Sequence, residues 1–239
     1  MISTDKAALR HAVGDAPANG DCQRPFSEVL TARAASRDLR KGERTRLRLL
    51  AATAAILQEE FLHTLRIGDI CAAAGVSPGT FYLYFDDKVE VTTAMLTGFA
   101  QHVFGCLDHA ARGAGDFEAS VRATTLAYVY AFALNRGLFR ALMQMSEESA
   151  SIEAIYQRLN GRWNQRTARA IARYRGATRG PGEEDVLRAF ALGGMVDEFL
   201  ANLYVRQDPV LTGRLSSPEA VARLLAELWL EALPRPARQ

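Results

Sequence analysis

The stretch GVSPGTFYLYFDDK, residues 75–88, places four aromatic side chains within five positions, between a Gly-Val-Ser-Pro-Gly opening and an Asp-Asp-Lys close. Gly75 is typical of a residue that ends a helix, because glycine adopts the left-handed conformation without strain. Ser77 followed by Pro78 predicts a new helix, since serine caps a first turn and proline suits its first position. The stretch therefore predicts a helix over residues 67–74, a tight turn, and a short helix over about residues 78–84.

Helical phasing separates the four aromatic side chains of this short helix. Phe81 and Phe85 lie four residues apart on one face, which we assign to the interior. The outward side then carries small, hydroxylated or aromatic residues, namely Gly79, Thr80, Tyr82 and Leu83. Tyr84 falls near the edge of the inward face. The alternative is that all four aromatics are core packing, but the turn, the cap and the shortness of the helix favour an exposed surface.

Two short helices joined by a glycine-containing turn form a helix-turn-helix. The second helix of this motif enters the DNA major groove. Thr80 and the tyrosine hydroxyls can donate hydrogen bonds to phosphate oxygens, and Lys88 can reach a phosphate. Tyr82 and Leu83 offer apolar contacts to thymine methyl groups, while Gly79 permits close approach. These residues predict a DNA-binding surface.

The block from residue 44 to residue 95, and most closely ICAAAGVSPGTFYLYFDDKVEV (70–91), resembles the DNA-binding domain of the TetR family of bacterial transcriptional repressors. The resemblance implies an all-helical homodimer that binds operator DNA through its first three helices and an inducer through a larger C-terminal domain. It implies phosphate contacts by Thr80, Tyr84 and Lys88. It implies base or groove contacts by Pro78, Gly79 and Tyr82.

The chain departs from the family pattern before the helix over residues 67–74. Arg66 stands where the family usually has a serine or threonine cap, with Thr64 nearby, and we assign Arg66 to a phosphate contact. Gly68 offers no side chain for a base contact early in that helix, so base reading should depend on the following helix. The predicted DNA-contacting set is Arg44, Arg66, Ser77, Pro78, Gly79, Thr80, Tyr82, Leu83, Tyr84 and Lys88.

The remaining sequence is helical in pattern, with no alternating strand pattern, and predicts an all-α fold of about nine helices. We expect three parts: residues 1–40 as a mobile basic N-terminal arm, residues 41–88 as the helix-turn-helix domain, and residues 89–239 as a ligand-binding and dimerisation domain. The whole chain of 239 residues carries a net charge of only +2. Residues 24–48, however, include eight basic and three acidic residues, so this segment is locally basic. Whether residues 1–40 fold is left open.

Composition excludes several classes of protein. No apolar run is long enough for a transmembrane helix. Three distant cysteines predict neither a disulfide framework nor a metal site, which favours a reducing cytoplasm. The four histidines form no metal spacing, and no nucleotide-binding or catalytic motif is present, so we expect no metal, no cofactor and no enzyme activity. The alternatives are a helical enzyme, or a helical ligand-binding or dimerisation module without DNA function.

The C-terminal part predicts two further sites. The resemblance implies that the last two strong helices pair with their copies in a homodimer, and the interface candidates are Leu187, Phe190, Gly194, Leu224, Leu228 and Trp229. Polar or soft residues at apolar helical positions suggest a cavity for a hydrophobic or aromatic inducer, and these are His102, Phe104, Tyr128, Phe132, Met143, Met145, Tyr156, Asn160 and Trp163. Each of them alone is also compatible with ordinary core packing. Repression and activation are both left open.

Overall fold

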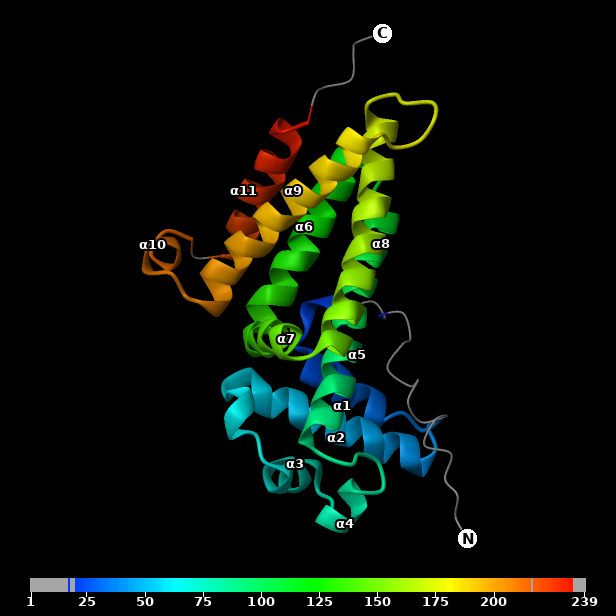
Figure 1. The fold of residues 1–239 in the computed structure, drawn as a ribbon, viewed down its shortest axis with the longest axis vertical. Helices are drawn as coiled ribbons and strands as arrows, with labels where there is room; N and C mark the ends of the chain where they lie inside the picture. The colour runs from blue at the N-terminus through cyan, green and yellow to red at the C-terminus, as the bar shows by residue number, and fades with distance from the viewer. Residues whose placement is uncertain (1–16, 18–19, 216, 234–239) are drawn as a thin grey trace. The chain divides into compact units, whose positions relative to one another are not determined.

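The computed structural model describes residue 17, residues 20–215 and residues 217–233, and these residues form helices and no strands. Figure 1 shows the helices in chain order. Their bounds are α1 Phe26–Ala34, α2 Lys41–Glu59, α3 Ile67–Ala74, α4 Pro78–Phe81, α5 Lys88–Gly113, α6 Phe117–Leu134, α7 Arg136–Glu148, α8 Ala150–Tyr174, α9 Glu183–Leu200, α10 Pro209–Thr212 and α11 Pro218–Glu231. The predicted all-α fold is confirmed. None of the described helices is long and apolar enough to cross a bilayer.

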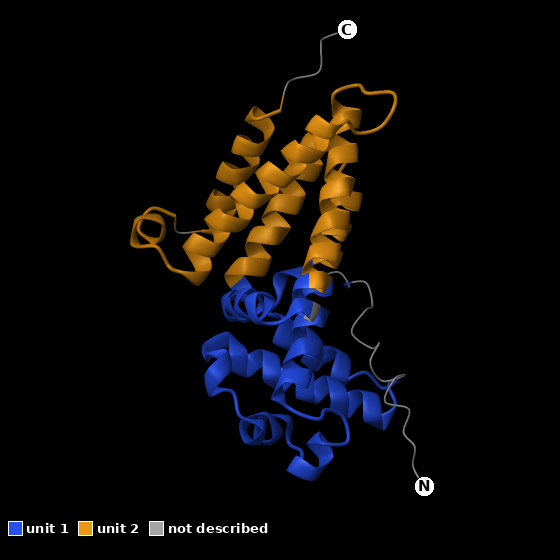
Figure 2. Cartoon of the chain, viewed as in Figure 1, with its two compact units in different colours: residues 1–103, 134–153 blue, residues 104–133, 154–239 orange. Residues whose placement is uncertain are grey.

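The chain divides into two compact units, which Figure 2 colours separately. Unit 1 comprises residues 1–103 and 134–153, and unit 2 comprises residues 104–133 and 154–239. The long helices α5 and α8 each contribute residues to both units. The second unit therefore begins inside α5.

Unit 1 is built on α2, whose apolar positions recur at three- and four-residue intervals. Leu47, Leu50 and Leu57 are buried along one stripe of this helix, as its period predicts. At the start of α7, Gly137 packs so closely on α2 that a Cβ there would lie 2.3 Å from the carbonyl oxygens of Leu57 and Gln58. Unit 1 is thus closed by a helix that comes from far along the chain.

Part of the predicted N-terminal arm is folded. Residues 1–16, 18 and 19 lie outside the described residues, whereas α1 packs extensively on α2. Phe26 is fully buried, and its backbone N–H donates a 2.8 Å hydrogen bond to the Asn135 side chain. Val29, Leu30 and Ala34 are buried as well. Helix α1 is thus anchored by a partner that is distant in sequence.

The cysteines differ from the sequence expectation. Cys22 and Cys106 are each disulfide-bonded, while Cys71 is a free, buried thiol. The prediction that the cysteines form no disulfide is therefore wrong, because spacing along the chain does not show which residues folding brings together. Cysteine usage consequently gives no argument for a reducing compartment.

Unit 2 contains α6, α9 and α11, with the C-terminal parts of α5 and α8. Helix α9 ends at Leu200, and a π-helical turn, Ala201–Val205, follows it. Helix α10 lies between this turn and α11. Asp208 caps this helix by accepting hydrogen bonds from the N–H groups of Val210 (2.9 Å) and Leu211 (3.2 Å). The Asp-Pro pair at 208–209 is a start signal that the sequence analysis missed.

Candidate nucleic-acid interface and enclosed cavity

The turn between α3 and α4 is fixed by two local interactions. Gly75 ends α3 with φ 63°, a left-handed conformation that favours glycine. A Cβ at this position would also lie 2.8 Å from the Arg48 guanidinium. Ser77 then caps α4, because its hydroxyl accepts a 3.2 Å hydrogen bond from the Thr80 N–H. Helix, turn and helix thus follow the order that the sequence predicts.

The aromatic residues of the second helix divide between core and surface. Phe81 and Phe85 are buried with ring centroids 5.9 Å apart, as helical phasing predicts. The Arg46 guanidinium lies 5.4 Å from the Phe85 ring centroid. Tyr82 and Leu83, in contrast, are 52% and 67% exposed. Because these two large side chains bury so little, they form a surface that is available for contact with another molecule.

The hydroxyl groups of Ser77 and Thr80 form a small network beside this surface. Their oxygens lie 3.0 Å apart, and the Ser77 oxygen already accepts the Thr80 N–H. If Ser77 donates its hydrogen to the Thr80 hydroxyl, the Thr80 hydrogen is left to donate outward. Pro78 and Gly79 are exposed between them, and only the Ser77 hydroxyl lies within 4 Å of a Cβ built at Gly79. This edge is therefore open to close approach.

Tyr84 and Lys88 lie at the margin of the same surface and are partly buried. The Tyr84 hydroxyl lies over the first turn of α2, 3.6 Å from the position of a Cβ at Gly42. The Lys88 ammonium donates a 3.3 Å hydrogen bond to the carbonyl of Leu65. An ammonium group has three donors, so two remain for a phosphate.

Arg66 and Arg44 are exposed. Arg66 occupies the N-cap position of α3 without capping it through its side chain. Thr64 does not replace it as a cap, because its hydroxyl donates to the Phe61 carbonyl at 2.8 Å and to Glu60 at 3.2 Å. The Arg66 side chain thus does not cap the helix, and its charge is available to bind a polyanion.

The region that contains this motif matches a known family. Residues 49–95 match the model described as bacterial regulatory proteins, tetR family. This region therefore resembles the DNA-binding domain of the TetR family, and the match spans the helix-turn-helix described above. No curated protein matches the sequence.

Solved structures share the fold of this chain. A putative transcriptional regulator from Pseudomonas aeruginosa PAO1 has a TM-score of 0.64 at 19% identity, covering 81% of this chain and 91% of that one. A putative TetR-family regulator from Rhodococcus sp. has a TM-score of 0.63 at 16% identity, with coverage of 80% and 99%. The fatty acid degradation regulator FadR from Bacillus halodurans has a TM-score of 0.62 at 16% identity, with coverage of 80% and 97%. At these identities the likeness shows the fold alone.

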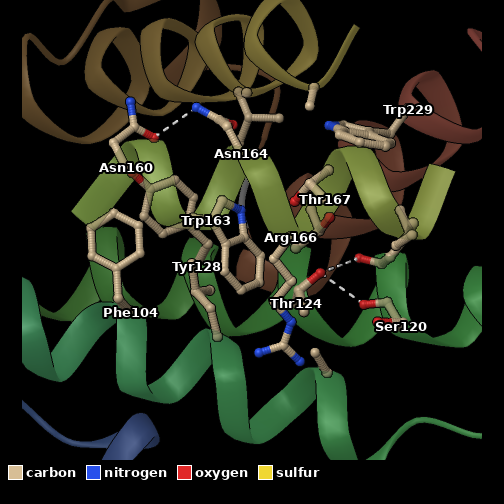
Figure 3. Close-up of a pocket in the computed structure, with 18 of the residues that line it drawn as sticks. Phe104, Ser120, Thr124, Tyr128, Asn160, Trp163, Asn164, Arg166, Thr167 and Trp229 are labelled. Carbon is tan, nitrogen blue, oxygen red and sulfur yellow. Dashed lines mark hydrogen bonds between the residues drawn. The ribbon is translucent and has the colours of Figure 1, made fainter. Parts of the chain in front are cut away.

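Unit 2 contains a partly open cavity of about 120 Å³ between α5, α6, α8, α9 and α11. Four of the predicted cavity residues line it: Phe104, Tyr128, Asn160 and Trp163. Figure 3 shows Phe104 and Trp229 toward opposite ends, with Tyr128 and Trp163 between them. Aromatic rings therefore form one part of the cavity wall.

The other predicted cavity residues lie elsewhere. Phe132 is buried behind the wall, where its ring packs edge-on against Tyr128 with centroids 5.2 Å apart. Tyr156 is absent from the cavity lining but interacts with Tyr128. His102, Met143 and Met145 belong to unit 1, so they do not line this cavity.

Sequence reasoning missed most of the polar wall. The residues that it missed include Ser120, Thr124, Asn164, Arg166, Thr167 and Asp197, together with the ring of Trp229. Spacing could have identified two of the missed residues. Thr124 lies four residues after Ser120, and Asn164 lies four residues after the predicted Asn160, so each pair shares a helix face. The Asn164 amide donates to Asn160 at 3.2 Å.

One carboxylate sits in the cavity wall. The Tyr128 hydroxyl donates a 2.8 Å hydrogen bond to Asp197, linking α6 to α9. Burial raises the pKa of the Asp197 carboxyl, and the Tyr128 hydrogen bond partly opposes this. Burial, with the Asp197 charge, raises the pKa of Tyr128 well above its ordinary value. Tyr128 is therefore a protonated donor at neutral pH.

Proposed function

We propose that the chain is a repressor that binds a pseudo-palindromic operator as a homodimer and is released by a small-molecule inducer. The observation that carries this proposal is the exposed Tyr82–Leu83 surface, held in place by the buried Phe81 and Phe85. Two such surfaces in a dimer would enter successive major grooves, about 34–36 Å apart. We place the regulator in the cytoplasm, because its DNA partner is there.

Exposed apolar residues on α9 and α11 support the dimer. Leu187, Phe190, Leu224 and Leu228 are all exposed, and Gly194 has no atom within 4 Å of a built Cβ. The two helices are held together at one end, where Arg188 donates a 2.9 Å hydrogen bond to the Ala232 carbonyl. Trp229 is buried and lines the cavity, so we now assign it to ligand contact rather than to the interface.

Helix α5 supports a link between inducer and operator. It begins at Lys88, three residues after the buried Phe85, and its residues Phe104, Leu107 and Ala111 line the cavity. A ligand that repositions these residues acts on the helix that follows the DNA-binding surface. A coupling free energy of about 1–3 kcal/mol is enough to change operator occupancy substantially.

Selection of bound DNA from a random pool, followed by binding titrations on the selected site, tests this function. The expected result is an inverted repeat. Tyr82→Ala should weaken binding by about tenfold, because the loss of one groove contact costs about 1–3 kcal/mol. Its thermal unfolding temperature should fall only slightly, because Tyr82 is 52% exposed and loses only an edge-on ring contact with Phe81, at a centroid distance of 5.4 Å. Phe61→Ala is the matched control, since Phe61 is also 52% exposed but lies outside the helix-turn-helix. Equal operator affinity for the Tyr82 variant and the parent protein would contradict the assignment.

A further inference from the structure

The wall of the cavity contains two formally charged side chains, Arg166 and Asp197, and their surroundings differ. Arg166 forms an ion pair with Asp108, and its guanidinium lies 5.8 Å from the Trp163 ring centroid. Asp197 has the Tyr128 hydroxyl as its hydrogen-bond partner, and no basic side chain in the described residues pairs with it. The wall therefore offers one negative charge that no protein cation compensates.

A partly buried carboxylate without a counter-charge is costly, because it has lost water and gained only one hydrogen bond. A positively charged nitrogen in the cavity would supply the missing partner by forming an ion pair with the Asp197 carboxylate. Tyr128 keeps its proton at neutral pH, so it holds the carboxylate in place without adding a second negative charge. The site thus favours the binding of a cation over that of a neutral group of the same size.

The rest of the wall favours an aromatic ring next to that nitrogen. Phe104, Phe117, Tyr128, Trp163 and Trp229 all line the cavity. Ring faces attract cations as well as stacking with other rings. The cavity volume of about 120 Å³ is close to that of an engineered apolar cavity, about 150 Å³, that holds a benzene molecule. A single aromatic ring is therefore the size of group that the cavity fits.

We propose that this cavity binds an aromatic amine, a ligand with one aromatic ring and a positively charged nitrogen that pairs with Asp197. The proposal rests on the inducer role proposed above for the same cavity. An anionic ligand is the competing class, suggested by the row of Arg162, Arg166, Arg169 and Arg173 on α8. Of these four, only Arg166 lines the cavity, and Asp108 already neutralises it.

The two tryptophans of the chain, Trp163 and Trp229, both line the cavity, so intrinsic fluorescence reports on its occupancy. The probes are 4-phenylbutylamine, 4-phenylbutanol and 4-phenylbutyrate, which share a ring and a chain and differ in the charge of one end. We expect the full-length protein to bind the amine at least about tenfold more tightly than the alcohol, and the butyrate most weakly. A fully formed buried charge pair justifies a ratio of this size.

Variants identify the residue that sets this preference. Asp197→Asn should bring the amine-to-alcohol ratio of affinities close to one, whereas Tyr128→Phe and Arg166→Gln should retain it. The Tyr128 variant is the matched control, because it breaks the same hydrogen bond and leaves the negative charge. If the Asp197 variant does not fold, the three probes on the parent protein still decide the matter. Equal binding of amine and alcohol, tightest binding of the butyrate, or binding of none would overturn the proposal.

The same titrations separate the ligand class from the regulatory function, because they contain no DNA. If the amine binds with the expected preference but does not release the operator, the inducer role fails and the ligand class stands. If a neutral or anionic probe both binds better and releases the operator, the ligand class fails and the inducer role stands.

Discussion

His102 is buried against the ring of Phe26, with the two ring centroids 5.2 Å apart. Burial, and next the nearby charge of Arg33, lower its pKa to about 4, although Asp21 acts in the opposite direction. A polar residue at an apolar helical position was the sequence signal for a ligand cavity. His102 is instead a neutral histidine in the core of unit 1, because the apolar contacts around it keep the imidazole uncharged at neutral pH.

The histidine makes the stability of the fold depend on pH. An unfolded histidine titrates near 6.5, so between about pH 6.5 and 4 the unfolded chain binds the extra proton. The contribution of His102 to the free energy of unfolding should therefore be fully present above pH 6.5. The free energy of unfolding should fall by up to about 3 kcal/mol as the pH drops to about 4. Urea titrations at several pH values measure this change.

His102→Gln should remove that part of the pH dependence, whatever it costs in stability at pH 7.5. His109→Gln is the control, because His109 lies on the same helix α5 and is exposed. A His102 variant whose free energy of unfolding falls with acid as steeply as that of the parent protein would show that another group is responsible.

At the scale of single helices, local signals predicted most of the fold. The bounds of α3 agree residue for residue with those predicted, since Gly75 follows directly and ends the helix. The π-helical turn after α9 could not be predicted, because nothing in ANLYV differs from an ordinary helical sequence. The anchoring of helix α1 could not be predicted, because Phe26 is fixed by Asn135 and Phe99 rather than by its neighbours in sequence.

The contact between α2 and α7 gives a prediction at this scale. Gly137→Ala should destabilise unit 1 by about 3 kcal/mol, because the new Cβ would overlap backbone oxygens, which cannot move aside as a flexible side chain would. Gly161→Ala makes the same chemical change within α8, where no atom lies within 4 Å of the added Cβ. It should stabilise the protein by about 0.5–1 kcal/mol. Thermal unfolding of both variants distinguishes steric overlap from helix propensity, and similar stabilities would contradict the close packing.

At the scale of the whole molecule, the two candidate sites differ in how far they could be predicted. The candidate DNA-contacting residues, except Arg44 and Arg66, lie within residues 77–88, so turn chemistry and helical phase locate most of that site. The cavity takes residues from five helices, and the acid that gives it its charge, Asp197, lies in α9 beyond any local pattern. The polar side chains of its wall come together only when those helices pack. Four of the nine residues predicted for the cavity therefore line it.

Dimerisation is the property of the whole molecule on which the operator symmetry depends. Leu187, on α9, is 62% exposed, and Leu187→Glu should place a charge in the proposed interface. We expect this variant to sediment as a monomer and to lose at least about tenfold in operator affinity, because an unpaired charge buried between two copies costs several kcal/mol. Val210→Glu is the matched control, since Val210 is 61% exposed but lies on α10, outside the proposed interface. It should remain dimeric and bind the operator normally. If both variants stay dimeric, the interface lies elsewhere; if both become monomeric, it extends over α10, and the assignment to α9 and α11 alone is wrong.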